Sequence, residues 1–222
     1  MASFGRGCLV AMLIAALLNL PAMAAGAKPL GMVVTAENAH LGGANAAIGA
    51  DVYTGDNLQT EPGGTLRLKV GSTQLYLASA SAATLLEEAP KVNIKLVRGT
   101  VGFSSAAADQ FEVETPIGRV RAADGQRGFG EVTVTGPQTI LVAAYHGSLV
   151  FEGDGEERTI KEGDAYNITL ASDPEPSPQG GGSTYGKKRN YIFTLIIIAG
   201  AAVIAAALWH EAVESPSRPP RP

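Results

Sequence analysis

The chain has 222 residues, one cysteine and a formal net charge of −4 at pH 7. Neutralisation of phosphates supplies most nucleic-acid affinity, so an acidic chain with scattered charges is not expected to bind nucleic acid. The cysteine, Cys8, lies in an apolar N-terminal segment. If that segment is removed, the mature protein has no disulfide, no thiolate metal ligand and no thiol nucleophile.

Residues 1–25 have the features of a secretory signal peptide. Arg6 supplies a positive charge, an apolar run occupies residues 9–20, and Pro21 ends it. Ala22-Met23-Ala24 then places small residues at the positions that a signal peptidase recognises. The sequence therefore predicts export. The alternative, a buried N-terminal helix, would need a second, polar face that the segment lacks.

The next part of the chain, residues 26–171, alternates polar and apolar side chains with a period of two. This pattern predicts strands with one buried and one wet face, and turn residues separate the strands. We therefore expect an all-β domain, a sandwich or roll of short antiparallel strands. Residues 80–88 fit either a short helix or a strand. The predicted strands lie at residues 65–70, 74–77, 92–97, 111–114, 119–122 and 131–135.

One predicted hairpin is specific enough to give a strand register. Thr115-Pro116-Ile117-Gly118 suits a tight turn, with proline second and glycine fourth. Antiparallel pairing would then set Glu114 opposite Arg119, Val113 opposite Val120, Glu112 opposite Arg121 and Phe111 opposite Ala122. We expect the charged pairs on the wet face and the apolar pairs in the core.

The C-terminal part is predicted to contain a membrane anchor. Residues 172–190 are rich in proline and glycine and predict a linker, and residues 191–209 predict one transmembrane helix. Nineteen residues at about 1.5 Å each span roughly 28 Å, close to the ~30 Å of a hydrocarbon core. Residues 210–222 predict a short disordered tail.

The expected topology places the β domain outside and the tail in the cytoplasm of a bacterial inner membrane. The signal segment favours this arrangement. Lys187, Lys188 and Arg189 oppose it, because basic residues favour the cytoplasmic side and only Arg218 and Arg221 follow the segment. We expect the upstream signal to decide the orientation.

An ordered series of short motifs resembles the FecR domain of bacterial envelope regulators. The series begins with Gly55-Asp56-Asn57-Leu58-Gln59-Thr60 and the strand Gly64-Thr65-Leu66-Arg67-Leu68. It continues with Phe111-Glu112-Val113-Glu114-Thr115-Pro116, then His146-Gly147-Ser148-Leu149-Val150, then Glu162-Gly163-Asp164-Ala165. The resemblance covers about residues 31–170 and implies an extracytoplasmic β domain.

Two departures limit what this resemblance implies. Gly125-Gln126-Arg127-Gly128-Phe129-Gly130 stands where the family has a "G-T-x-F-x-V" motif, which leaves the local strand register open. The iron-transport regulators of the family carry a cytoplasmic anti-sigma segment before their membrane span, and this chain has no such segment. The resemblance therefore does not imply control of a sigma factor.

No catalytic, cofactor or metal site is predicted. His40, expected in a loop, His146, expected in a turn, and His210 show no metal-ligand spacing. No nucleophile elbow occurs, and the glycine pairs 42–43 and 63–64 indicate turns. The acidic residues 152–157 could bind Ca²⁺, but Asp154-Gly155 between two strand-like runs favours a plain hairpin.

The function expected from these features is that of a non-catalytic, membrane-anchored binding or scaffold module for another envelope protein or a glycan. The alternative is a transmembrane signalling protein related to FecR-type regulators. Gly200, Ala201 and Ala205 put small residues on the predicted helix and favour homo-oligomer formation through that face. The proline-rich tail is too short to fold as an anti-sigma domain, which favours the binding module.

Overall fold

The computed structural model describes residues 28–88, 91–106, 111–171 and 190–196. All of its fifteen strands belong to one continuous sheet. The strands are β1 (Gly31–Leu41), β2 (Ala44–Asn45), β3 (Asp51–Val52), β4 (Asn57–Val70), β5 (Thr73–Leu77), β6 (Ala82–Glu88), β7 (Lys91–Ser105), β8 (Phe111–Thr115), β9 (Gly118–Ala122), β10 (Gly128–Gly136), β11 (Thr139–His146), β12 (Leu149–Gly153), β13 (Glu156–Ile160), β14 (Ala165–Leu170) and β15 (Tyr191–Ile196).

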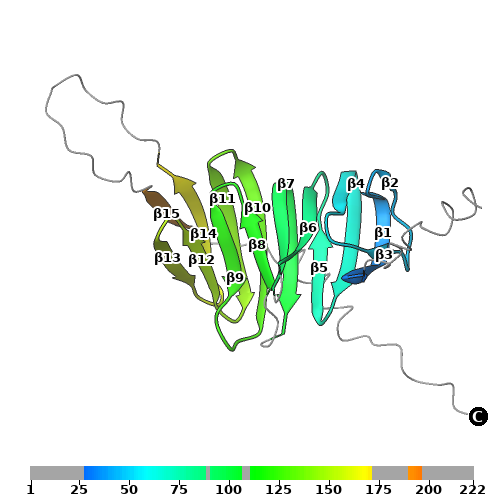
Figure 1. The fold of residues 1–222 in the computed structure, drawn as a ribbon. Helices are drawn as coiled ribbons and strands as arrows, with labels where there is room; N and C mark the ends of the chain where they lie inside the picture. The colour runs from blue at the N-terminus through cyan, green and yellow to red at the C-terminus, as the bar shows by residue number, and fades with distance from the viewer. Residues whose placement is uncertain (1–27, 89–90, 107–110, 172–189, 197–222) are drawn as a thin grey trace, which may run out of the picture.

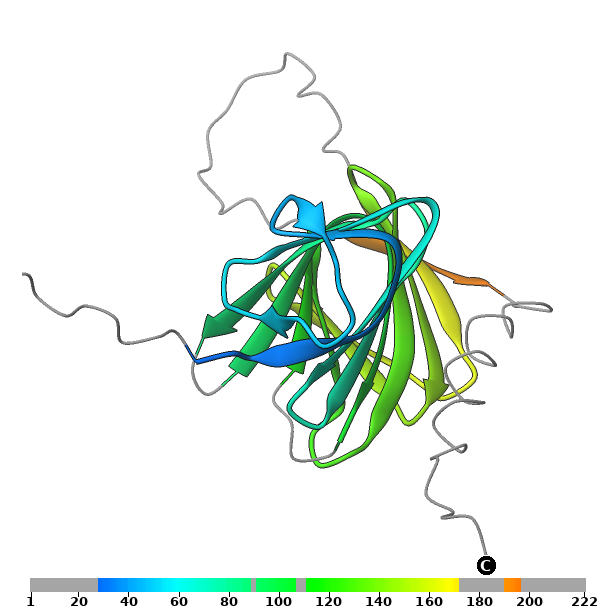
Figure 2. The same ribbon diagram turned by 90° about the vertical axis from the view of Figure 1, so that its right-hand side faces the viewer.

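The sheet rolls up into two layers that enclose the core (Figures 1 and 2). Layer A contains, in order, β13, β12, β9, β8, the first half of β7 and β6. Layer B contains β15, β14, β11, β10, the second half of β7 and β5. The long strands β1, β4 and β7 run from one layer into the other and connect them. The predicted all-β sandwich or roll is confirmed, with one parallel pair, β7 with β8, among antiparallel neighbours.

The bends in the long strands depend on glycine and on bulges. In β7, Gly99 has a φ of 81°, and a Cβ there would lie 2.5 Å from Ser81 Cα. In β4, residues 61–64 bulge out opposite the single residue Asn38 of β1. The turn predicted at Gly63-Gly64 is therefore wrong: the strand continues through this bulge, because β1 pairs with β4 on both sides of it.

Alternating side chains fill the space between the layers. Layer A contributes Leu85, Ile94, Val113, Val120 and Phe151, all fully buried. Layer B contributes fully buried residues from its own strands, among them Leu75, Phe103, Val132, Ile140 and Ile168. The predicted period-two strands lie within β4, β5, β7, β8, β9 and β10, and the open region 80–88 forms strand β6. Period-two burial on both layers is why the sequence pattern predicted the fold class.

The predicted hairpin forms between β8 and β9 in the predicted register. Glu112 pairs with Arg121, Val113 with Val120, Glu114 with Arg119 and Thr115 with Gly118. The expected charge contacts are wrong, however, because the two acids make ion pairs with Lys91 and Lys95 of β7 instead. β8 lies parallel to β7, so these lysines come within reach of it, and a pattern within one hairpin does not reveal that third strand.

The last strand, β15, corrects part of the C-terminal prediction. Residues 191–196 were expected to begin a transmembrane helix, but they form a strand paired with β14, from Leu170↔Tyr191 to Ala165↔Ile196. The backbone N–H of Ala171 donates to the carbonyl of Asn190 at 2.8 Å, so the two ends of the predicted linker lie side by side. Residues 172–189 therefore connect two paired strands of the sheet, and the β structure extends past residue 171 to Ile196.

Aromatic packing explains why these residues are extended. Tyr191 and Phe193 point into the end of the roll and pack edge-on against Phe151 of β12, at ring-centroid distances of 5.3 and 5.9 Å. The Tyr191 hydroxyl donates to the carbonyl of Ile117 at 2.9 Å. Arg158 of β13 lies over the ring of Phe193, 5.3 Å from its centroid, and thus bridges the two layers.

Several predictions concern residues outside the described ranges. These are the signal peptide, most of the linker, residues 197–209 of the predicted helix with Gly200, Ala201 and Ala205, and the tail with His210. Among the described residues, none belongs to a helix long and apolar enough to cross a membrane.

Candidate functional site

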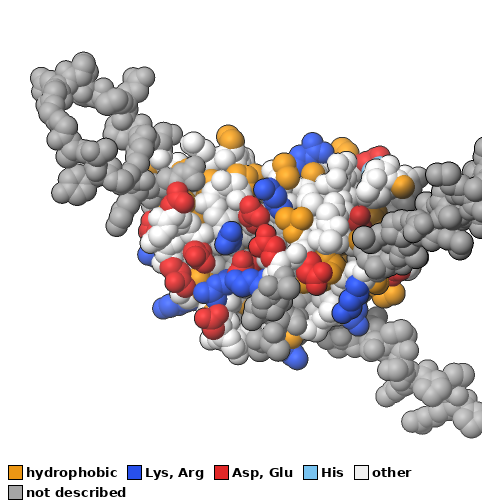
Figure 3. Space-filling view, viewed as in Figure 1, with side chains coloured by type: hydrophobic (Ala, Val, Ile, Leu, Met, Phe, Trp, Pro, Cys, Tyr) orange, Lys and Arg blue, Asp and Glu red, His pale blue; other side chains and the backbone are white. Residues whose placement is uncertain are grey.

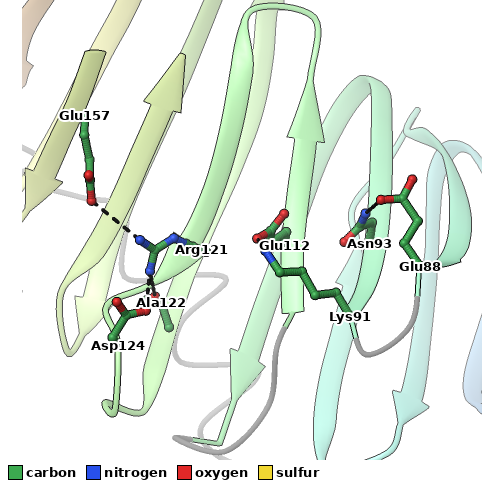
Figure 4. A network of polar contacts seen from close by, with 8 residues as sticks. All are labelled: Glu88, Lys91, Asn93, Glu112, Arg121, Ala122, Asp124 and Glu157. Atoms are coloured by element: carbon green, nitrogen blue, oxygen red, sulfur yellow. Dashed lines mark hydrogen bonds and ion pairs between the residues drawn. The ribbon is translucent and has the colours of Figure 1, made fainter. Parts of the chain in front are cut away.

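The outward face of layer A is a network of opposite charges. Acidic and basic side chains are mixed across this face (Figure 3). Arg121 of β9 donates to Asp124 at 2.6 Å and lies 3.5 Å from Glu157 of β13 (Figure 4). On the next two strands, Glu114 of β8 pairs with Lys95 of β7 at 3.5 Å. These charged side chains are paired with one another on a solvent-exposed surface. Few unpaired charged groups therefore remain on this face to bind a ligand.

One ion pair of this network is largely buried. Glu112 has only 8% of its side chain exposed, and it accepts a hydrogen bond from Lys91, which is 45% exposed (Figure 4). Beside them the amide of Asn93 donates to Glu88 at 3.0 Å, and its buried Oδ1 has no hydrogen-bond partner among the described residues. The Lys91–Glu112 ion pair links β8 to β7 at the end of these strands where their parallel pairing begins.

The outward face of layer B has a different chemistry. Among the described residues of these layer B strands, Glu131 is the one Asp, Glu, Lys or Arg at an outward position, and Arg67 of β4 lies next to the face, opposite Tyr76 of β5. The face is rich in threonine, and hydroxyls meet across strands, Thr100 with Thr133 at 2.9 Å and Thr139 with Thr169 at 3.3 Å. Such a face is polar but nearly uncharged.

Three aromatic side chains gather around Glu131. Phe129 and Tyr145 pack with ring centroids 5.3 Å apart, and the Tyr145 hydroxyl donates to Glu131 Oε2 at 3.3 Å. On the other side, Glu131 faces Gly102 of β7, and Gly102 in turn faces Tyr76 of β5. Gly102 itself is buried. We call Tyr76, Phe129, Glu131 and Tyr145 the tyrosine–glutamate patch.

The carboxylate of this patch has no cationic partner. In the described part of the chain, Glu131 accepts hydrogen bonds from two hydroxyls, those of Tyr145 and Thr133, and no Lys, Arg or His lies in ion-pair contact with it. Burial raises the pKa of Glu131 above its ordinary value, against the smaller opposing effect of these hydrogen bonds. Burial and the nearby Glu131 charge also raise the pKa of Tyr145 well above its ordinary value.

The pKa of Tyr76, which lies on the other side of Gly102 from Glu131, is also raised. Burial raises the pKa of this phenol, Arg67 lowers it, and Glu131 and Glu37 raise it further. Both tyrosines therefore stay neutral at physiological pH and present a hydroxyl and a ring face. A partly buried carboxylate, ring faces and hydroxyls can together accept and donate hydrogen bonds to a polyol while packing on its apolar face.

Of the histidines singled out from the sequence, His40 lies apart from this patch, whereas His146 is the cross-strand partner of Phe129 at its border. His40 lies in β1, not in a loop, because it pairs with β2 and β4, and its Nε2 lies 2.9 Å from Glu61. His146 ends β11, with Nδ1 3.5 Å from Glu162. A backbone hydrogen bond from Gly147 lowers the pKa of the Glu162 carboxyl, and His146 lowers it further. Within the described residues, no three His, Cys, Asp or Glu side chains gather as a metal site would require.

The acidic stretch 152–157 forms the predicted hairpin between β12 and β13. Gly153 pairs with Glu156, and Asp154 and Gly155 have φ angles of 28° and 83° at its tip. Two central residues with positive φ are what a tight hairpin turn of this kind needs.

Sequence patterns did not reveal the tyrosine–glutamate patch. Its members come from the hairpin of β10 and β11 and from β5, which is far from that hairpin in sequence, and β7, which lies between β5 and β10 in the sheet, contributes only Gly102. A signal was present in the predicted strand 131–135, where Glu131 alternates with buried Val132. That signal places Glu131 outward and says nothing of which rings surround it.

The chain resembles solved structures in its fold but matches no family model. No family model matches the chain, and no curated protein matches it. Two crystal structures of a candidate anti-sigma factor from Parabacteroides distasonis resemble this structure, with TM-scores of 0.49 and 0.48 at 10% and 11% identity. The similar regions cover 68% of this chain and 64% and 63% of those chains. These values do not assign the chain to a family.

Proposed function

We propose that this chain is an exported, non-catalytic binding module of the bacterial envelope, with a FecR-like β domain anchored to the inner membrane by its C-terminal apolar segment. Its ligand binds at the tyrosine–glutamate patch. The observation that carries the proposal concerns Glu131: it is the one Asp, Glu, Lys or Arg at an outward position of the described layer B strands, it is partly buried, and no described cation makes an ion pair with it.

A neutral glycan fits this patch best. Sugar hydroxyls can donate to the Glu131 carboxylate as Tyr145 and Thr133 already do, and a sugar ring can pack its apolar face on Tyr76 or Phe129. An acidic ligand would meet an unneutralised carboxylate and an acidic protein, which disfavours it. An envelope protein that presents hydroxyl and amide donors is the competing ligand.

Titration of the full-length protein in detergent with neutral hexasaccharides, chitohexaose, cellohexaose and maltohexaose, tests the proposal. We expect at least one to bind, and Tyr76→Ala and Glu131→Gln each to weaken that binding at least tenfold. Lys95→Ala, on the outward face of layer A, is the matched control and should leave the affinity unchanged. No binding by any hexasaccharide contradicts the glycan proposal, and equal loss in the control contradicts the site.

The signalling alternative has one observation in its favour. The strand β15 ends at Ile196, and the apolar residues of the candidate anchor follow it in the sequence with no linker between. A ligand that changes the packing of β15 can therefore change how much of the apolar run is available to the membrane segment. A reporter of membrane-segment association, measured with and without a bound hexasaccharide, tests this second function: an unchanged signal contradicts it.

A further inference from the structure

The residues of β15 belong to two segments at once. They form the last strand of the roll, and they are also the first six residues of the apolar run 191–209. We infer that Tyr191–Ile196 alternates between these two places, docked on β14 in one state and inserted in the membrane in the other. This inference rests on the proposed anchoring.

Length makes the two states exclusive. As a helix, residues 191–209 span roughly 28 Å, which suits a hydrocarbon core of ~30 Å. When β15 is docked, 13 apolar residues remain, 197–209, and they would span only about 20 Å as a helix. A run of that length is below the ~17 residues that a transmembrane helix needs. A full span therefore requires β15 to leave the sheet.

The composition of β15 fits both places and is unusual for an edge strand. Edge strands are normally protected by charged residues, whereas β15 has none. Its side chains Ile192 and Leu195 are 55% and 53% exposed, two of the large apolar residues that the folded domain leaves uncovered. A membrane would bury both.

Docking of β15 depends on its ladder with β14 and on specific contacts of its aromatic side chains. Tyr191 and Phe193 pack on Phe151, and the Tyr191 hydroxyl reaches the Ile117 carbonyl at 2.9 Å. Gly153 makes room for this ring, since a Cβ there would lie 2.5 Å from the Tyr191 hydroxyl oxygen. When β15 leaves, the edge of β14 and the ring of Phe151 lose this cover.

Disulfide trapping in the full-length chain separates the two states. Asn167 and Thr194 are cross-strand partners on β14 and β15, so Asn167→Cys with Thr194→Cys reports docking. Leu141 and Asn167 are cross-strand partners on β11 and β14, so Leu141→Cys with Asn167→Cys is the matched control. Both pairs are made in a Cys8→Ser background, expressed in bacteria, oxidised, and separated by alkaline extraction of the membranes.

We expect the β14–β15 cross-link in the extracted fraction and less than a tenth as much in the membrane pellet, whereas the control cross-link forms equally in both. The additional substitution Gly153→Val, which places a side chain where Tyr191 docks, should shift protein from the extracted fraction to the membrane pellet. Equal β14–β15 cross-linking in extract and pellet, or none in either, overturns the inference while leaving the anchoring intact. Absence of wild-type chain from the pellet instead contradicts the proposed anchoring.

Discussion

The two outward faces of the roll are built from strands of one sheet, yet they differ in how their polar groups are satisfied. On layer A, Arg121, Glu112 and Glu114 each have an oppositely charged partner. On layer B, the partners of Glu131 in the described part of the chain are hydroxyls, and aromatic rings lie beside it. From this difference we expect the charge pairs of layer A to stabilise the domain, and we propose that the nearly uncharged face of layer B binds the ligand.

The largest expected effect concerns the bend that separates the two faces. Gly99→Ala puts a Cβ within 2.5 Å of Ser81 at a φ of 81°, so we expect a loss of at least about 3 kcal/mol in the free energy of unfolding. Gly71→Ala, at a φ of 60° with no atom within 4 Å of the added Cβ, should cost only about 1 kcal/mol. Urea unfolding measures both, and equal losses would contradict the role of the bend.

A smaller effect is expected on layer A. Lys91→Met removes the cation beside buried Glu112, and an uncompensated carboxylate should lower stability by about 1–3 kcal/mol. Lys95→Met removes the partner of the more exposed Glu114 and should cost less than about 0.5 kcal/mol. Thermal unfolding of the two variants compares them. A Lys91 variant as stable as the Lys95 variant would mean that this face does not stabilise the domain.

On layer B, removal of a charge should raise the stability of the domain instead of lowering it. Because burial raises the pKa of Glu131 in the folded state, its contribution to stability is greatest below its unfolded pKa and is lost as the pH rises through the folded pKa. Glu131→Gln should therefore raise the melting temperature modestly at pH 7, and this gain should vanish near pH 4. On layer A, Glu114→Gln should give no gain. A destabilised Glu131→Gln at pH 7 would show that this carboxylate is already compensated.

The smallest effect concerns Glu162, at an edge outside both faces. A hydrogen bond from the Gly147 N–H lowers its pKa, so its stabilising contribution is present at neutral pH and is lost as the pH falls through the lowered folded pKa. Glu162→Gln should flatten the acid limb of the stability curve slightly. The pH dependence of the melting temperature between pH 2 and 7 checks this, and an unchanged acid limb would contradict it.

The fold class could be predicted because its cause is local. In each predicted strand, the alternation of polar and apolar residues shows which side chains are buried. The turn Thr115–Gly118 fixed the register of β8 and β9. The strand β11 was missed because its run Ile140-Leu141-Val142-Ala143-Ala144 is apolar on both faces and does not alternate. The parallel pairing of β7 and β8 was missed because it joins strands through a connection that carries no turn signal.

The candidate site and β15 could not be predicted for a related reason. Tyr76 and Glu131 are 55 positions apart in sequence and lie on the same face of the sheet because both are register partners of Gly102 in β7. For residues 191–196, hydropathy predicts a membrane helix equally well whether or not a β14 edge is available. The strand is favoured by the packing of Tyr191 and Phe193 on Phe151, a tertiary contact that hydropathy does not reveal.

Hydrogen–deuterium exchange of the full-length protein tests the central claim most directly, that the outward face of layer B binds the ligand. Exchange is measured with and without a saturating concentration of the hexasaccharide that binds. The account predicts slower exchange in peptides from β5, β10 and β11, with peptides from β8, β9 and β13 unchanged. Protection confined to β8, β9 and β13 would place the ligand on the charged face and contradict the account.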